Sequence, residues 1–274
     1  MTKDGAPEDH NGPEQIREIS DGLHWLCGCI SLEYKGRMIH SYVAPYLIIG
    51  SEKTLMVDSG HGGHWPTVEE KLNRLLDGRK LDYLFATHPE MPHAGNVTRV
   101  VEAHPECQLV GDMRDLHLYF PESEAAFVPK QVGDSLDLGD RTFSFHEAIV
   151  RDLVNTQWGF DDKSGVLFVA DGFGFSHYHG VGECGQLAEE LADEITSEQV
   201  TFLNDAALAW IRYTDLTPIL ARVDALVAEL GVRAIAPAHG AVVTDIDGTF
   251  AKIRDMMLSG RDFVPPVLAA EAVG

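Results

Sequence analysis

Two histidines and a glutamate stand close together in the segment THPEMPHAGN, residues 87–96. Histidine and glutamate bind transition metals through imidazole nitrogen and carboxylate oxygen, which makes His88, Glu90 and His93 candidate ligands. Their spacing differs from that of H-E-x-x-H, which places two histidines on one face of a helix. Two prolines within the segment oppose a regular helix. We therefore expect a metal-binding loop here.

Two more candidate ligands share the placement of His88. Asp171 and His239 each end a predicted strand and precede a loop marked by glycine. A rigid sheet presents functional groups on the loops at one of its edges. A single histidine at such a position is more often structural. Three ligand types at strand ends favour a metal site.

The pattern of apolar residues predicts the elements that position these ligands. Helical periodicity and glycine stops indicate helices at 67–80, 94–103 and 214–230. Apolar and β-branched runs indicate strands at 24–34, 42–50, 53–60, 81–88, 107–111, 134–140, 141–150, 163–171 and 232–240. The chain begins with strands, continues with alternating helices and strands, and then returns to strands. This order predicts an α/β (α+β) fold, a four-layer αββα sandwich.

The bulk composition limits the partners and the compartment. With 43 acidic against 21 basic side chains, the net charge of −22 disfavours nucleic acid and anionic membranes as partners. No apolar run approaches the roughly 20 residues that span a bilayer. Four cysteines are too few for a disulfide framework, which favours the cytoplasm. We interpret Cys27 and Cys29 as small core residues, and expect a disordered tail at 1–15 and one domain at 16–274.

Several stretches match a known family in order: VDSG, DYLFATHPE, GDSLDLGDRTFSF, VADGFG and IAPAHG. Over residues 17–260 the chain resembles the metallo-β-lactamase superfamily, and most of all the diiron, oxygen-binding domain of flavodiiron proteins. The resemblance implies the metallo-β-lactamase fold and two iron ions. It also implies the ligands, which are His88, Glu90, His93, the bridging Asp171, and His239.

The chain departs from that pattern at two ligand positions. Pro92 replaces the aspartate of the loop, and the third histidine is missing. Asp152 lies 19 residues before Asp171, the spacing at which the family places that histidine. His146 is the rival candidate. With Asp152, three carboxylates and three imidazoles favour iron or manganese over zinc.

Pro92 leaves two interpretations of the second metal position. Either open coordination positions bind a small molecule, or the second metal is weak or absent. His61, His177 and His179 lie in loops near the expected rim and are candidates for catalytic groups. The alternative for each is an ordinary loop or pocket-lining residue.

The resemblance implies a metal-dependent oxidoreductase that uses or binds dioxygen, as an oxidase or an oxygenase. Its substrate would be dioxygen or another small molecule. We do not expect a flavodoxin domain here, so a separate protein would donate the electrons. The resemblance also implies a homodimer. The alternative is a binuclear hydrolase acting on a small ester, amide or lactone. A non-catalytic oxygen or NO sensor, or a degenerate scaffold, is the second alternative.

Overall fold

The structure is a computed structural model that describes residues 12, 14–180, 183–191 and 195–259. Most of the expected tail at 1–15 lies outside the described residues, as do residues 260–274 of the expected single domain. Within the described part of the chain, no helix is long and apolar enough to cross a membrane.

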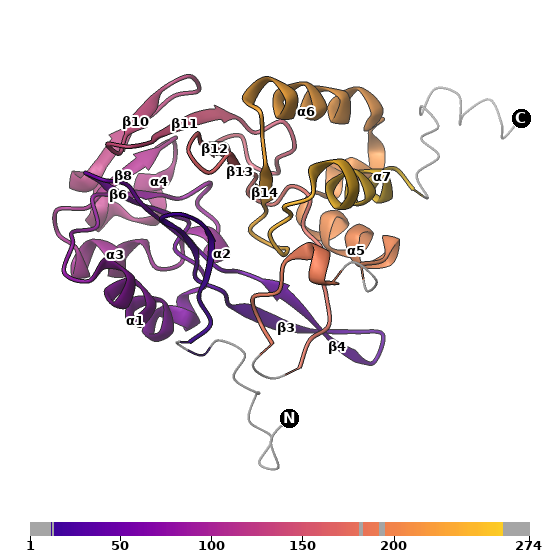
Figure 1. Ribbon diagram of the computed structural model, residues 1–274, viewed down its shortest axis with the longest axis horizontal. Coiled ribbons are helices and arrows are strands. Elements are labelled where there is room, and N and C mark those ends of the chain that lie inside the picture. The colour runs from indigo at the N-terminus through magenta and orange to yellow at the C-terminus, as the bar shows by residue number, and fades with distance from the viewer. Residues whose placement is uncertain (1–11, 13, 181–182, 192–194, 260–274) are drawn as a thin grey trace, which may run out of the picture.

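Two sheets form the centre of the molecule (Figure 1). The first has seven strands in the order β1-β2-β5-β6-β7-β8-β9, with bounds Arg17–Ser20, Leu23–Trp25, Tyr46–Ile49, Thr54–Val57, Tyr83–Phe85, Gln108–Gly111 and Phe127–Pro129. The second has five strands, β10 to β14, with bounds Ser135–Asp137, Thr142–Glu147, Gln157–Asp161, Val166–Phe168 and Ala234–Ala236. A separate hairpin is formed by β3 (Cys29–Tyr34) and β4 (Arg37–Tyr42).

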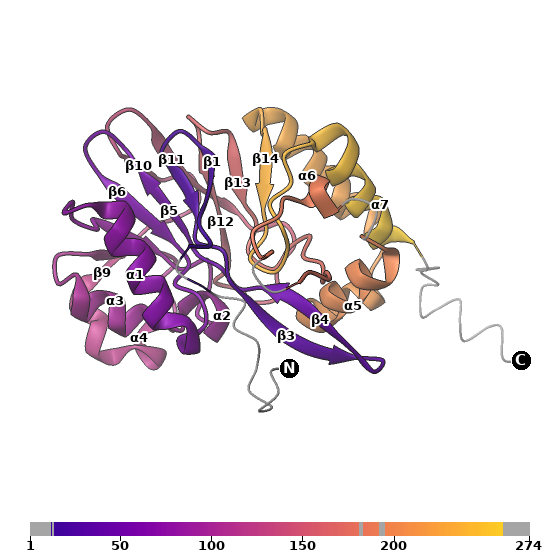
Figure 2. The ribbon, with the colours of Figure 1, turned by 60° about the horizontal axis from the view of Figure 1, so that its bottom comes forward.

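Helices cover the outer faces of the two sheets (Figure 2). The helices are α1 to α7, with bounds Trp65–Leu76, Met91–Ala94, Val97–Ala103, Leu116–Tyr119, Ser197–Ala207, Thr217–Leu230 and Ala251–Leu258. Helices α1 and α3 lie on one side, and α6 and α7 lie on the other. The predicted four-layer αββα sandwich is confirmed.

Aromatic side chains fill the space between the sheets. Phe85 of the first sheet meets Phe145 of the second edge to face, with 5.1 Å between ring centroids. Tyr46 and Phe168 make the same kind of contact at 5.1 Å. A second apolar cluster, which includes Leu72 and Leu84, joins α1 to the outer face of the first sheet. Burial of both sheet faces fixes the strand ends relative to each other.

Parallel strand pairs bring the candidate ligands to one edge. Strand β6 runs parallel to β7, and β13 runs parallel to β14. Because parallel strands end at the same edge of a sheet, the residues that follow them lie together. The first pair leads into Asp58 and His88, and the second pair leads into Asp171 and His239.

The structure corrects several predicted elements. The strand expected at 24–34 is two strands, β2 and β3, which belong to different sheets. The sequence reading also missed the hairpin partner β4, the central strand β12 and the helix α5. Strand β12 reads QWGFD, so a glutamine, a glycine and an aspartate replace the apolar run that marked the other strands.

Candidate metal centre

Asp171 stands at the centre of the predicted ligand set. One group of side chains offers donor atoms within 4.8 Å of one another and contains His88, Glu90, Asp152 and Asp171. A second group contains His88, His93 and Asp171. Asp171 is 4% exposed, so its carboxylate is enclosed by these neighbours.

The two oxygens of Asp171 face different neighbours. Oδ1 lies 3.0 Å from Nε2 of His93 and 3.2 Å from Nε2 of His239. Oδ2 lies 3.5 Å from Nε2 of His88. A carboxylate in this position can bind one metal ion through each oxygen.

The first group has the chemistry of a metal cradle. Nε2 of His88 lies 3.8 Å from Glu90 Oε2, and Asp152 completes the group. The side chain of His88 is fully buried, and neither ring nitrogen has a hydrogen-bond partner among the described residues. Because a buried polar atom without a partner costs free energy, a ligand at this position is favoured. An oxygen-rich set with one imidazole fits iron or manganese.

The imidazoles of His93 and His239 are each oriented by a partner on the side away from Asp171. Nδ1 of His93 lies 2.9 Å from Oδ2 of Asp58, and the hydroxyl of Thr87 donates to Oδ1 of the same carboxylate at 2.9 Å. On the other side of the centre, Nδ1 of His239 lies 2.9 Å from the carbonyl oxygen of Tyr42. A partner on Nδ1 directs Nε2 of each imidazole toward Asp171, which is the common arrangement behind metal-binding histidines.

The charges of the centre support one another. Burial opposes ionisation of Asp171, but His93, His239 and His88 outweigh it and hold the pKa of this carboxyl well below its ordinary value. Burial also opposes a charge on His93, but Asp58 and Asp171 hold its pKa well above the ordinary value. Without a metal, the imidazolium of His93 therefore lies between the carboxylates of Asp58 and Asp171. A metal cation bound at this position would replace the proton of His93.

The two outer carboxylates of the first group differ. The nearby imidazole of His88 lowers the pKa of Glu90 against the effect of burial. Burial raises the pKa of Asp152, although His88 opposes this and the amide of Leu153 donates a hydrogen bond to its carboxylate at 2.6 Å. Asp152 is half-buried, whereas Glu90 faces solvent.

The segment between His88 and His93 was expected to be a loop. This expectation was wrong, because the segment contains the start of a short helix. Helix α2 begins after Glu90, and Pro92 occupies its first turn. Proline is tolerated there because the first amides of a helix have no partner within the helix. The turn aims His93 into the centre, with 0% of the residue exposed.

The remaining predicted residues lie apart from Asp171. His146, on β11, places Nε2 2.8 Å from the hydroxyl of Ser144. His61 accepts a hydrogen bond from the amide of Gly63 in its own loop. His177 is buried and stacks on Tyr42 with 4.4 Å between ring centroids. Burial, His179 and His40 hold the pKa of His177 well below its ordinary value.

Asp58 and Thr87 are site residues to which the sequence reading gave no role. Both follow strands of the first sheet, and Asp58 has a left-handed backbone with φ of 55°. A non-glycine residue in that region is uncommon and often marks a functional constraint. The signal in the sequence was an aspartate directly after an apolar strand, in VDSG.

Comparison with known proteins places the chain in a family. The Metallo-beta-lactamase superfamily matches residues 40–187. A coenzyme F420H(2) oxidase from Methanothermobacter marburgensis is 29% identical over 253 residues, which cover 84% of this chain and 58% of the relative. A nitric oxide reductase from Moorella thermoacetica is 24% identical over 273 residues, 93% of this chain and 64% of the relative. The chain thus spans less than two thirds of the length of these relatives.

The fold agrees with this placement. The crystal structure of the flavodiiron protein from Giardia intestinalis matches with a TM-score of 0.72 at 16% identity, over 88% of this chain and 58% of the other. The similarity to these proteins lies in the sandwich that carries the Asp171 centre. The chain belongs to the metallo-β-lactamase superfamily, and the proteins it is similar to are flavodiiron proteins.

Proposed function

We propose that this chain is a non-haem diiron oxidoreductase that uses dioxygen. His88, Glu90 and Asp152 would hold one iron ion, His93 and His239 would hold the other, and Asp171 would join them. The proposal rests on one observation: the two carboxylate oxygens of Asp171 face different donors. Oδ1 faces His93 and His239, whereas Oδ2 faces His88.

The donor set favours iron over zinc. Three carboxylates and three imidazoles form a hard, oxygen-rich environment, whereas zinc sites more often combine nitrogen and sulfur. Two ferrous ions bound there would supply electrons for the reduction of dioxygen. The oxidase and reductase named among the relatives support an oxidoreductase rather than a hydrolase.

The chain's own residues would then perform three tasks. Asp58 and the carbonyl of Tyr42 orient His93 and His239 through their Nδ1 atoms. The imidazoles of His93, His239 and His88 keep the carboxylate of Asp171 ionised against the effect of burial. Pro92 offers no ligand atom, so the second metal position has only the imidazoles of His93 and His239 and one oxygen of Asp171. Open positions of this kind are where a metal centre accepts a small molecule.

Reduction of dioxygen also requires an electron donor. A separate redox protein, or an organic substrate oxidised at the centre, would supply the electrons. His61 and His177 remain predicted as groups that handle protons near the rim. The low pKa of His177 makes it a neutral donor or acceptor rather than an imidazolium at neutral pH.

The experiment that tests this function combines metal content with dioxygen uptake. Protein would be reconstituted anaerobically with ferrous iron, freed of excess metal, and mixed with a known amount of dioxygen. We expect about two irons per chain and consumption of dioxygen by the reduced protein, with both lost in Asp171→Asn.

The matched control is Asp161→Asn, which changes another buried aspartate, one that pairs with Arg141. The control should retain both iron and dioxygen uptake. A protein that binds zinc in preference to iron, and cleaves small esters without dioxygen, would replace this proposal with the hydrolase.

A further inference from the structure

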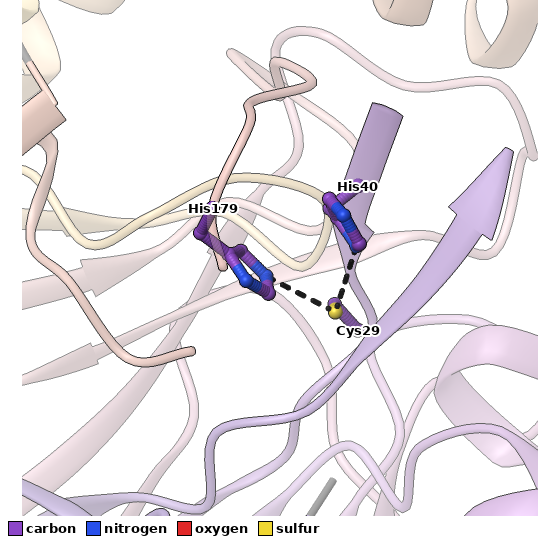
Figure 3. Close-up of side chains that lie close together, drawn as sticks. All are labelled: Cys29, His40 and His179. Carbon is purple, nitrogen blue, oxygen red and sulfur yellow. Dashed lines mark hydrogen bonds between the residues drawn. The ribbon is translucent and has the colours of Figure 1, made fainter. Parts of the chain in front are cut away.

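A second cluster of metal-binding side chains lies outside the Asp171 centre. Sγ of Cys29, on β3, lies 3.6 Å from Nδ1 of His40, on β4, and 3.4 Å from Nε2 of His179. Figure 3 shows both imidazoles directed at the sulfur. Cys29 is 3% exposed and His40 is 6% exposed, so the cluster is enclosed by protein.

A fourth side chain joins this cluster from the same segment as His179. The thiol of Cys184 is a neighbour of Cys29 and His179 and influences the pKa of both. Cys184 is 8% exposed. The donor atoms of Cys29, His40 and His179 all lie within 4.8 Å of one another, and Cys184 adjoins two of them.

The distances agree with tetrahedral coordination. With zinc–sulfur bonds of about 2.3 Å and zinc–nitrogen bonds of about 2.0–2.1 Å, a tetrahedral site separates sulfur from nitrogen by about 3.5 Å. Both measured separations, 3.6 and 3.4 Å, match this edge. Four donors of two thiolates and two imidazoles form one of the common structural zinc sets.

The surroundings also prepare His179 as a ligand. Its Nδ1 lies 2.8 Å from the carbonyl oxygen of Gly180, so this nitrogen carries the proton and donates it. In a neutral imidazole the other nitrogen is then an acceptor, the form in which it binds a metal. That nitrogen, Nε2, is the atom that faces Cys29. A hydrogen bond of this kind behind a histidine is typical of metal ligands.

We propose that Cys29, His40 and His179, with Cys184 as the fourth ligand, form a structural zinc site that ties the β3–β4 hairpin to the residues around His179. Sulfur and nitrogen donors select zinc, whereas the oxygen-rich Asp171 centre favours iron. The chain would thus hold different metals at two centres. This role for His179 replaces the catalytic one expected from the sequence.

The zinc site would also position part of the Asp171 centre. His40 and Tyr42 are two residues apart on β4, and the carbonyl of Tyr42 accepts the hydrogen bond from His239. His177 and His40 exchange backbone hydrogen bonds of 2.9 Å, which join the two segments beside the cluster. Fixing this hairpin would therefore fix the orientation of His239.

The test measures zinc and iron in the same protein. The full chain would be loaded with both metals and dialysed, and its metal content compared with those of Cys29→Ser and Cys107→Ser. Cys107 is buried like Cys29 but lies outside the cluster. We expect about one zinc per chain in the wild type and in Cys107→Ser, and loss of that zinc in Cys29→Ser. Iron should remain in all three proteins.

A second readout separates the site from a folding defect. Cobalt bound by thiolates in a tetrahedral site gives intense visible absorption, which we expect in the wild type. The absorption should be absent in His179→Gln, a change at a partly exposed position, while the circular dichroism of that variant stays that of the wild type.

Three results would overturn the zinc site. The first is a Cys29–Cys184 disulfide, detected by mass spectrometry in the untreated protein. The second is loss of zinc in Asp171→Asn but not in Cys29→Ser. The third is iron bound in the cluster in place of zinc. The first would assign the cluster to thiol redox chemistry. None of the three depends on whether the Asp171 centre reacts with dioxygen.

Discussion

The carboxylate of Asp58 lies 2.9 Å from Nδ1 of His93, on the opposite side of the ring from Asp171. His93 is thus held between two carboxylates, one behind it and one in the centre. Asp58 has no place in the predicted ligand set, yet it determines which nitrogen of His93 faces the centre.

Removing the charge behind His93 should weaken the second metal position. Asp58→Asn keeps the side-chain shape, and asparagine tolerates the left-handed backbone at this position. Changes of this kind behind a ligand cost about 10–100-fold in metal affinity. We expect a loss of that size for one of two irons, measured by competition with a chelator.

The control for Asp58→Asn is Asp77→Asn. Asp77 also has a left-handed backbone, with φ of 45°, but it ends helix α1 on the surface. Its iron affinity should equal that of the wild type. Equal affinity in both variants would show that Asp58 serves the fold and not the metal.

Asp152 and His146 can be compared directly as candidates for the missing ligand. Asp152 lies in the donor group with His88, whereas His146 faces the hydroxyl of Ser144. We therefore expect Asp152→Ala to retain about one iron fewer per chain, and His146→Ala to retain the wild-type content. Elemental analysis after anaerobic loading measures both. The reverse result would make His146 the ligand through a rearranged β11.

Restoring a carboxylate at residue 92 should strengthen the second metal position. Pro92 stands in the first turn of α2, next to His93. Pro92→Asp adds an oxygen ligand where the resemblance places an aspartate, so iron should dissociate more slowly into a chelator. Pro92→Ala removes the ring without adding a ligand and serves as the control. Equal dissociation rates for the two variants would mean that residue 92 does not reach the metal.

Metal binding should release a proton from His93. Burial opposes the charge on His93, but Asp58 and Asp171 raise its pKa well above the ordinary value, so the metal-free chain carries this proton at neutral pH. Asp171, with a lowered pKa, is already ionised and releases none. Metal affinity should therefore fall as the pH falls, because a bound imidazole must be neutral.

Calorimetry in buffers of different ionisation enthalpy counts the protons released. Wild type should release about one proton more than His93→Gln on binding iron at neutral pH. His61→Gln, a change to a loop histidine, should match the wild type. Equal release from wild type and His93→Gln would show that His93 is neutral before metal binds.

The sequence by itself determined the fold class and the residues that follow the central strands. Each of the segments VDSG, LFATH, FVAD and APAH contains or follows an apolar run and includes a polar residue at its end. An apolar run followed by a polar residue is a local pattern, so it can be recognised from the sequence alone. Local patterning also named His88, Glu90, His93, Asp171 and His239, whereas the resemblance to the family named Asp152. The structure brings these six residues together at Asp171.

Only the tertiary structure decided which atoms face each other. Three contacts join residues far apart in the chain. They are the contacts of the two Asp171 oxygens with different histidines, the contact of Asp58 with His93, and the cluster at Cys29. Cys29 and His179 are 150 positions apart, so neither residue signals the other locally. Such contacts depend on how two sheets and a hairpin pack together, and packing is set by the whole core rather than by any one segment.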